Sequence, residues 1–89
     1  MILFDVRSPR EYAAGHVPGA RNLPFWKLFW RTPGLPDTRE APIMVYCGHG
    51  PRAWMATGLL RARGFRHVRL MAGHMRRWRK EGHRVERIP

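Results

Sequence analysis

The chain has 89 residues, 44% of them hydrophobic, and a formal net charge of +11. This length suits one small domain spanning residues 1–89. No segment approaches the roughly 20 apolar residues of a membrane-spanning helix, so we expect no membrane partner. The only cysteine, Cys47, fits a reducing compartment. The N-terminus carries an acid and lacks the small-residue cleavage site of a signal peptide, so we expect a cytoplasmic protein, and we expect it to be a monomer.

Basic residues are concentrated toward the end of the chain. Seventeen Lys and Arg residues stand against six Asp and Glu residues, and most of the basic ones lie between Arg61 and Arg87. Such charge steers an anionic substrate, binds nucleic-acid phosphates, or forms a solvated surface that reflects an Arg-rich composition. No recognised nucleic-acid motif accompanies it, so a nucleic-acid partner is an alternative without a supporting motif.

The first half of the chain predicts a buried strand at residues 2–6, because these residues are short, apolar and bounded by charge. Ser8, Pro9 and Glu11 then match a capping box, which predicts a helix that begins at Pro9 and ends before Gly15. The further elements expected here are a turn at 16–19, a brief strand at 20–23, one or two helical turns at 25–30 and a loop at 31–41.

Four aromatic residues crowd into the expected helical turns: Phe25, Trp26, Phe29 and Trp30. Small domains depend on large side chains for buried area, so we interpret this cluster as core packing. A base-stacking platform is the alternative, and it requires exposure on a sheet face.

The second half begins with an apolar strand at residues 42–46 that ends at the cysteine. The further elements expected are a helix at 53–63 with Ala53, Ala56, Leu59 and Leu60 on its buried face, a strand at 65–71, a turn at 72–74, a helix at 75–81 and a short strand at 84–88. Strands that alternate with helices predict a parallel sheet with helices on its faces.

The segment Cys47–Arg52 is a tight glycine-rich loop between a strand and a helix. Backbone N–H groups of such a loop converge on one point, and the helix dipole adds partial positive charge there. A thiol at that point loses its proton easily, and the thiolate is the reactive form of cysteine. The sequence therefore predicts one activated sulfur nucleophile.

Four blocks of the sequence resemble the single-domain rhodanese family of sulfurtransferases. Gly15–Pro24 is similar to the family segment Gly-His-Ile-Pro-Gly-Ala-x-Asn-Ile-Pro, and Val45–Ala53 to the active-site loop Tyr-Cys-x-x-Gly-x-Arg-Ser/Ala. Phe4–Arg7 with Glu11-Tyr12 resembles the opening motif, and residues 64–82 resemble the closing segment. The resemblance implies a small α/β fold of three layers, with a mostly parallel central sheet flanked by helices.

The family moves sulfane sulfur from a donor such as thiosulfate to a thiophilic acceptor, which is cyanide in the assay and a thiol or protein in the cell. The resemblance implies that Cys47 is the catalytic nucleophile and carries the sulfur as a persulfide, with no cofactor. The implied substrate-binding loop consists of Gly48, His49, Gly50, Pro51 and Arg52. The alternative is a sulfur-carrier or binding module that a partner protein loads and that does not turn over.

The roles of the charged residues are less sharply defined. The Arg52 guanidinium is suited to binding an anionic donor, or it pairs with Asp5 or Glu11 to lock the loop. Asp5 and Arg7 resemble the strand-end pair of the family, which supports the loop from behind. His49 is either a group that acts near the thiolate or a solvated loop side chain.

The remaining histidines do not predict a metal site. His16 belongs to the structural Gly-His-x-Pro-Gly segment and is interpreted as a hydrogen-bonded histidine. His67, His74 and His83 have no ligand spacing, and no Cys-x-x-Cys motif is present, so we expect no metal.

Loop length separates sulfur chemistry from phosphate chemistry. Phosphatases and arsenate reductases of the same fold have Cys-x5-Arg loops, whereas Arg52 closes a shorter one here and Ala53 stands where their arginine would be. Three features depart from the family pattern. His74 follows Gly73 in place of a second glycine, and Ala53 replaces a frequent serine. The chain also begins at the Asp-x-Arg strand, so we expect either a sheet that is one strand short or a fold trimmed to a minimum.

Overall fold

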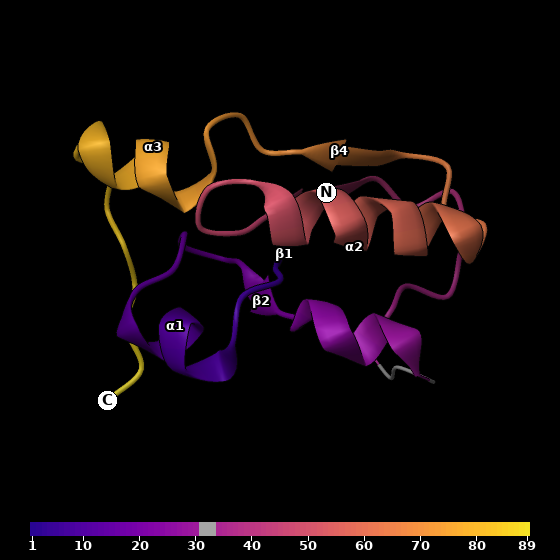
Figure 1. The fold of residues 1–89 in the computed structure, drawn as a ribbon, viewed down its shortest axis with the longest axis horizontal. Coiled ribbons are helices and arrows are strands. Elements are labelled where there is room, and N and C mark those ends of the chain that lie inside the picture. Colours follow the sequence, from indigo (N-terminus) through magenta and orange to yellow (C-terminus); the bar gives the residue numbers. More distant parts are fainter. Residues whose placement is uncertain (31–33) are drawn as a thin grey trace.

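Four parallel strands form the sheet of the computed structural model, which describes residues 1–30 and 34–89 (Figure 1). The strands are β1 (Ile2–Asp5), β2 (Arg21–Asn22), β3 (Ile43–Tyr46) and β4 (Val68–Leu70). The helices are α1 (Pro9–Ala14), the 3-10 helix η1 (Phe25–Phe29), α2 (Pro51–Ala62) and α3 (His74–Lys80). The strand order is β2-β1-β3-β4, so the predicted parallel α/β sheet is confirmed.

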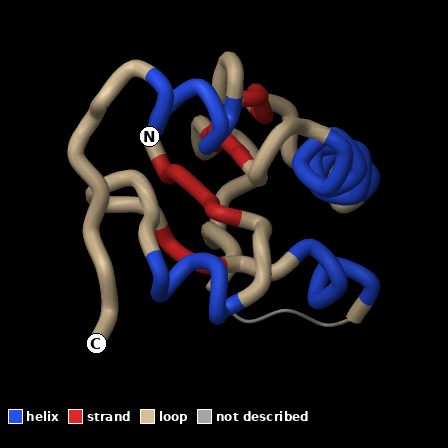
Figure 2. Tube along the Cα trace, turned by 60° about the vertical axis from the view of Figure 1, so that its left-hand side comes forward, coloured by secondary structure: helices blue, strands red, loops and turns tan. Residues whose placement is uncertain are grey.

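Successive side chains of the central strands point to opposite faces of the sheet and pack into two apolar clusters, one on each face. The cluster on the α2 and η1 face includes Phe4, Val45, Leu28 and Leu60, and the cluster on the α1 and α3 face includes Leu3, Tyr46, Tyr12 and Met75. Figure 2 shows helices on both sides of the strands. The expected three layers are therefore present.

Helix α1 begins as the capping box predicts. The Ser8 hydroxyl accepts a hydrogen bond from the Glu11 backbone N–H at 3.2 Å, and the Ser8 N–H donates to the Glu11 carboxylate at 3.2 Å. Gly15 ends the helix. His16, which follows, is buried, stacks on the Tyr12 ring and places Nδ1 2.8 Å from the Tyr12 carbonyl oxygen, as expected for a structural histidine.

Strand β4 is shorter than the predicted strand at 65–71. The Phe65 N–H donates to the Leu60 carbonyl near the end of α2, and the Arg66 N–H donates to the Arg39 carbonyl. The backbone of these two residues therefore forms hydrogen bonds outside the sheet. Leu70 lies on the outermost strand and is exposed, because only β3 flanks that strand.

The predicted strand at 84–88 does not form. Glu86 makes a single antiparallel bridge with His16, through two hydrogen bonds of 2.9 Å. The Ile88 N–H instead donates to the Ala13 carbonyl, so the C-terminal segment crosses the end of α1 and does not join the sheet.

The prediction that the aromatic cluster packs in the core is wrong for most of its members. Leu28 is buried and Phe25 half-buried, whereas Trp26, Phe29 and Trp30 are exposed. The 3-10 helix has three residues per turn, so Phe25 and Leu28 share one face and the residues between them point away. The exposed aromatics lie on η1 and at its end, not on the sheet.

None of the helices in the described ranges combines the length and apolar character needed to cross a membrane.

Candidate active site

Cys47 lies directly after β3, at the carboxyl edge of the sheet, where open α/β folds bind their ligands. The Gly50 N–H donates to the Cys47 sulfur at 3.0 Å, and the side chain of Cys47 has no solvent exposure. Gly50 has φ 138°, a backbone angle that side chains rarely permit, so glycine is needed to aim this amide at the sulfur. Helix α2 begins at Pro51, two residues before the predicted start, because the proline ring suits the first helical position.

Helix α3 holds the loop from its other side. The backbone N–H of Met75 donates to the Cys47 carbonyl at 3.0 Å, and that of Arg76 donates to the Gly48 carbonyl at 2.9 Å. These two bonds join the first turn of α3 to the first two loop residues. A shift of α3 therefore moves the backbone that carries the nucleophile.

Arg52 binds Glu11 and not Asp5, which decides between the two predicted ion-pair partners. Its guanidinium donates to both carboxylate oxygens, at 2.6 and 3.0 Å. This hydrogen-bonded pair lowers the pKa of Glu11 from 4.5 to about 2. A Cβ atom placed on Gly48 would lie 3.4 Å from the Arg52 guanidinium, so the arginine packs beneath the loop and connects it to α1.

Replacing Glu11 with glutamine should remove the negative charge of this ion pair, while the glutamine amide can still cap the start of α1. The pair is partly exposed, so screening limits the expected loss to about 1 kcal/mol of unfolding free energy. Folding lowers the pKa of Glu11, so its contribution is present above pH 4.5 and vanishes as the pH falls toward 2. Urea unfolding of both proteins across this pH range measures the difference. A gap that stays constant across the range would contradict the assignment.

Asp5 and Arg7 form a buried ion pair behind the loop. The Arg7 guanidinium donates to both oxygens of Asp5, at 2.8 to 3.2 Å, and to the Gly15 carbonyl at 2.7 Å. The Tyr46 hydroxyl accepts from the Val17 N–H at 3.0 Å, and burial, with the charge of Asp5, raises the pKa of Tyr46. The pair thus joins the end of β1 to the turn after α1.

His74 makes a contact with the loop that the sequence analysis did not predict. Its Nδ1 accepts a hydrogen bond from the Cys47 backbone N–H at 3.3 Å, so this nitrogen carries no proton in the bound tautomer. Its ring also lies beside Gly50, whose Cβ position is 3.6 Å from Nε2. His74 has φ 54°, in the left-handed region, which explains why a glycine is usual there. Burial, then the nearby charge of His49, lowers the pKa of His74.

Replacing His74 with asparagine should remove a pH-dependent part of the stability, because asparagine tolerates positive φ and does not titrate. Folding lowers the His74 pKa below 6.5, so the contribution is complete above pH 6.5 and is lost as the pH falls through the folded value. The unfolding free energy of the wild type should therefore fall more steeply below pH 6.5 than that of the variant. Parallel urea titrations test this, and equal slopes would contradict it.

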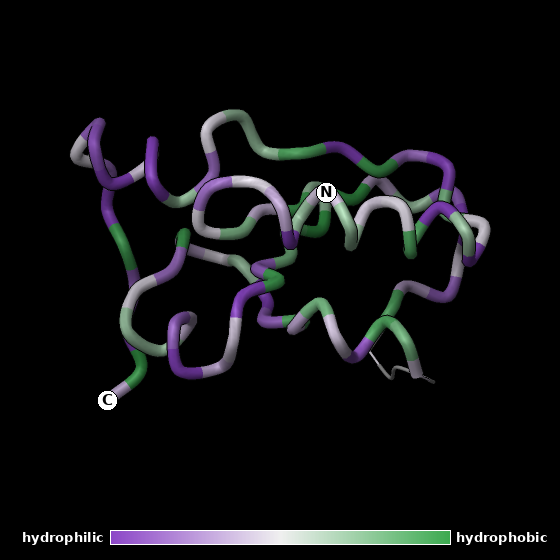
Figure 3. The backbone as a smooth tube through the Cα atoms, viewed as in Figure 1, coloured by the Kyte–Doolittle hydropathy of each residue, from purple (hydrophilic) through white to green (hydrophobic). Residues whose placement is uncertain are grey.

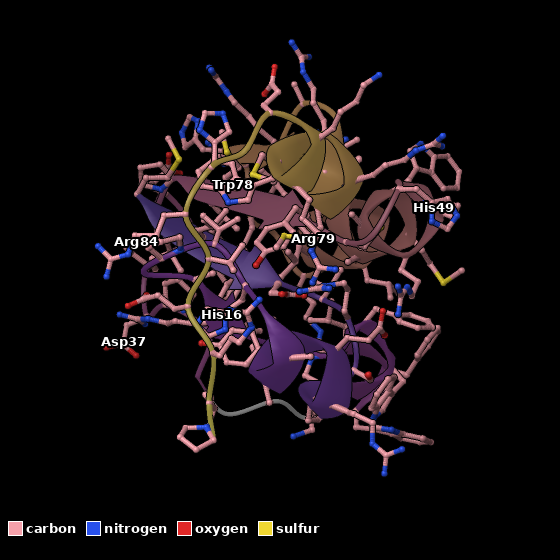
Figure 4. The ribbon with its side chains drawn as sticks, turned by 90° about the vertical axis from the view of Figure 1, so that its left-hand side faces the viewer. His16, Asp37, His49, Trp78, Arg79 and Arg84 are labelled. Carbon is pink, nitrogen blue, oxygen red and sulfur yellow. The ribbon has the colours of Figure 1, made fainter. Side chains whose placement is uncertain are left out.

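A cavity of 460 Å³ opens beside the loop. Its lining residues are Arg7, Gly48, His49, Met75, Arg76 and Arg79. His49 is exposed at its rim, and Figure 4 shows His49 at the edge of the molecule and Arg79 nearer the middle of the view. Among residues 1–30 and 34–89, no group of three His, Cys, Asp or Glu residues is placed to hold a metal ion.

The structure gathers most of the predicted site residues around Cys47. Gly50 contacts its sulfur, Arg52 packs under the loop, and Arg7 and His49 line the adjacent cavity. Asp5 lies behind the loop, paired with Arg7. The departure from Gly-Gly was the signal that could have pointed to His74.

Comparisons with known proteins agree with this geometry. The Rhodanese-like domain family matches residues 1–81. The chain is 35% identical over 80 residues to the thiosulfate sulfurtransferase GlpE of Pseudomonas entomophila, covering 88% of this chain and 70% of that protein. It is 33% identical to the uncharacterized protein YqhL of Bacillus subtilis, covering 85% of this chain and 59% of that protein. The structure of the human single-domain sulfurtransferase TSTD1 matches with a TM-score of 0.80 and 34% identity, covering 90% of this chain and 81% of that one.

The chain therefore belongs to the rhodanese-like family, a class of α/β domains in which relatives of this chain bear the name sulfurtransferase.

Proposed function

We propose that this protein transfers sulfane sulfur from an anionic donor such as thiosulfate to a thiol acceptor through a persulfide on Cys47. The observation that carries the proposal is the Cys47 sulfur under the Gly50 N–H, next to a cavity with arginine side chains on its wall. The chain contains no other thiol.

In the first step, the Cys47 thiolate attacks the outer sulfur of thiosulfate. A sulfur–sulfur bond forms on Cys47, the sulfur–sulfur bond of thiosulfate breaks, and the electron pair leaves with sulfite. The Gly50 N–H stabilises the anionic sulfur before the step. The positive charges of Arg76 and Arg79 on the cavity wall attract the dianionic donor and raise its concentration beside the loop.

In the second step, an acceptor thiolate attacks the outer sulfur of the persulfide. The new bond joins that sulfur to the acceptor, and the electron pair of the broken bond returns to Cys47 as a thiolate. The relay divides one transfer into two displacements on the same nucleophile. No proton, electron or cofactor is consumed when the acceptor enters as a thiolate.

The loop favours sulfur over phosphate. Ala53 occupies the position of a phosphatase arginine and is fully buried under the loop, so it offers no contact to an oxyanion. Arg52 is held by Glu11 at two oxygens, which leaves less of its guanidinium for a tetrahedral phosphate.

The second candidate is a carrier that a partner protein loads and that does not turn over with thiosulfate. The complete burial of the Cys47 sulfur favours it, because a buried thiol reacts slowly with small molecules in solution.

Intact mass spectrometry after incubation with thiosulfate tests the proposal. We expect the mass of the protein to rise by one sulfur atom and to return on addition of cyanide. A protein that gains sulfur only from a cysteine desulfurase would be the carrier. A protein that gains none from either source would contradict both functions.

A further inference from the structure

A second cavity adjoins the one at the loop, and its volume is larger than a small donor such as thiosulfate requires. It has a volume of 610 Å³, and its lining residues are His49, Gly73, Arg76, Arg77, Lys80 and Glu81. His49 and Arg76 line both cavities, so the two are neighbours. Cavities of about 300–1,000 Å³ accommodate molecules much larger than thiosulfate. The space along α3 therefore suits an extended ligand.

The walls of these two cavities carry an uncompensated positive charge. Arg7 is neutralised by Asp5, and Arg77 is 3.3 Å from Glu81. Arg76, Arg79 and Lys80 are exposed, and no carboxylate of the described residues pairs with them. Figure 3 shows α3 as a hydrophilic segment at one end of the molecule. A ligand with several carboxylates would complement this charge.

We infer that the two cavities bind an acidic polypeptide segment that carries a thiol and receives the sulfur of Cys47. This inference rests on the proposed sulfur relay and adds the class of acceptor. The acidic side chains lie on Arg76, Arg79 and Lys80, and the cysteine of the segment enters the cavity next to the loop. The acceptor thiolate then takes the outer sulfur of the persulfide, and Cys47 leaves as a thiolate.

Nucleic acid is the competing polyanion, and the lining residues argue against it. Single-stranded nucleic acid is held by aromatic rings on which bases stack. Neither cavity has a Trp, Tyr or Phe side chain in its lining. The exposed Trp54 is on α2, outside both cavities.

The test uses protein loaded with sulfur from thiosulfate, freed of donor and checked by mass. Single-turnover transfer is then measured to the peptides Glu-Glu-Cys-Glu-Glu and Gln-Gln-Cys-Gln-Gln, each over a range of concentrations. We expect the wild type to prefer the acidic peptide by about tenfold in the second-order rate constant, the effect of two exposed ion pairs. The preference should decrease when added salt shortens the screening length of the electrostatic attraction below about 8 Å.

Two double variants of equal charge locate the effect. Arg79→Gln with Lys80→Gln removes one unpaired charge from the wall of each cavity, and should reduce the preference to about twofold or less. Arg66→Gln with Arg69→Gln removes the same charge from β4 and the segment before it, and should leave the preference intact. Equal loss in both variants would show a general field effect and overturn the inference.

Two further outcomes separate this inference from the proposed function. A protein that cannot be loaded speaks against the relay itself. A loaded protein with no preference for the acidic peptide overturns the inference and leaves the relay standing. Stronger inhibition of transfer by polyuridylate than by polyglutamate would assign the surface to nucleic acid and likewise overturn it.

Discussion

Replacing Cys47 with serine is expected to lower kcat/KM for transfer of sulfur from thiosulfate to cyanide by at least about 10⁴-fold, the scale of losing a covalent nucleophile. A hydroxyl at this position is a much weaker nucleophile toward sulfur, and the chain has no other thiol to replace it. The measurement is the rate of thiocyanate formation, with donor and acceptor concentrations varied independently.

The fold should survive this substitution, because serine differs from cysteine by one buried atom of similar shape. Cys47→Ala is the matched variant that also removes the hydroxyl. Both variants should be inactive and should unfold within about 2 kcal/mol of the wild type. Activity above about 1% of the wild type in either variant would mean that the persulfide relay through Cys47 is not the mechanism.

Replacing Asp5 with alanine should have the largest effect on stability. The carboxylate is fully buried and accepts three hydrogen bonds from the guanidinium of Arg7, which is itself almost entirely buried. Removing one partner leaves an unpaired charge in the interior, which costs about 3–5 kcal/mol. For a domain of this size the melting temperature should fall by about 12 °C or more. Chemical and thermal unfolding measure both quantities.

The double variant Asp5→Leu with Arg7→Met separates the charge from the packing. It removes both ions and keeps apolar volume, so it should recover most of the stability lost by Asp5→Ala. If Asp5→Ala lost less than about 1 kcal/mol, the pair would not be the buried ion pair described above.

Local sequence signals predicted the parts of the fold that depend on a few neighbouring residues. The capping pattern at Ser8 and Glu11 defined the start of α1, because its hydrogen bonds join residues three apart. The position of Cys47 between a strand and a helix placed the nucleophile at the sheet edge for the same reason. The resemblance of the flanking motifs supplied the overall topology.

The features that the sequence did not predict depend on contacts between residues far apart in the chain. The exposure of Trp26 and Trp30 depends on which side of a 3-10 helix meets the sheet, and composition does not reveal that. The strand predicted at residues 84–88 had suitable residues but no partner strand. The contact between His74 and the Cys47 backbone joins residues 27 positions apart, so the departure from Gly-Gly marked the residue but did not reveal its partner.

The complete burial of the Cys47 sulfur also bears on oxidative damage. A cysteine oxidised to sulfenic acid is usually recovered by forming a disulfide with a second, resolving cysteine. These 89 residues contain no second thiol. The chain therefore cannot resolve a sulfenic acid on Cys47 by itself, and keeping peroxide away from the sulfur protects it. The lack of solvent contact at Cys47, under the Gly50 amide and behind the first turn of α3, supplies that protection while the domain waits between two transfers.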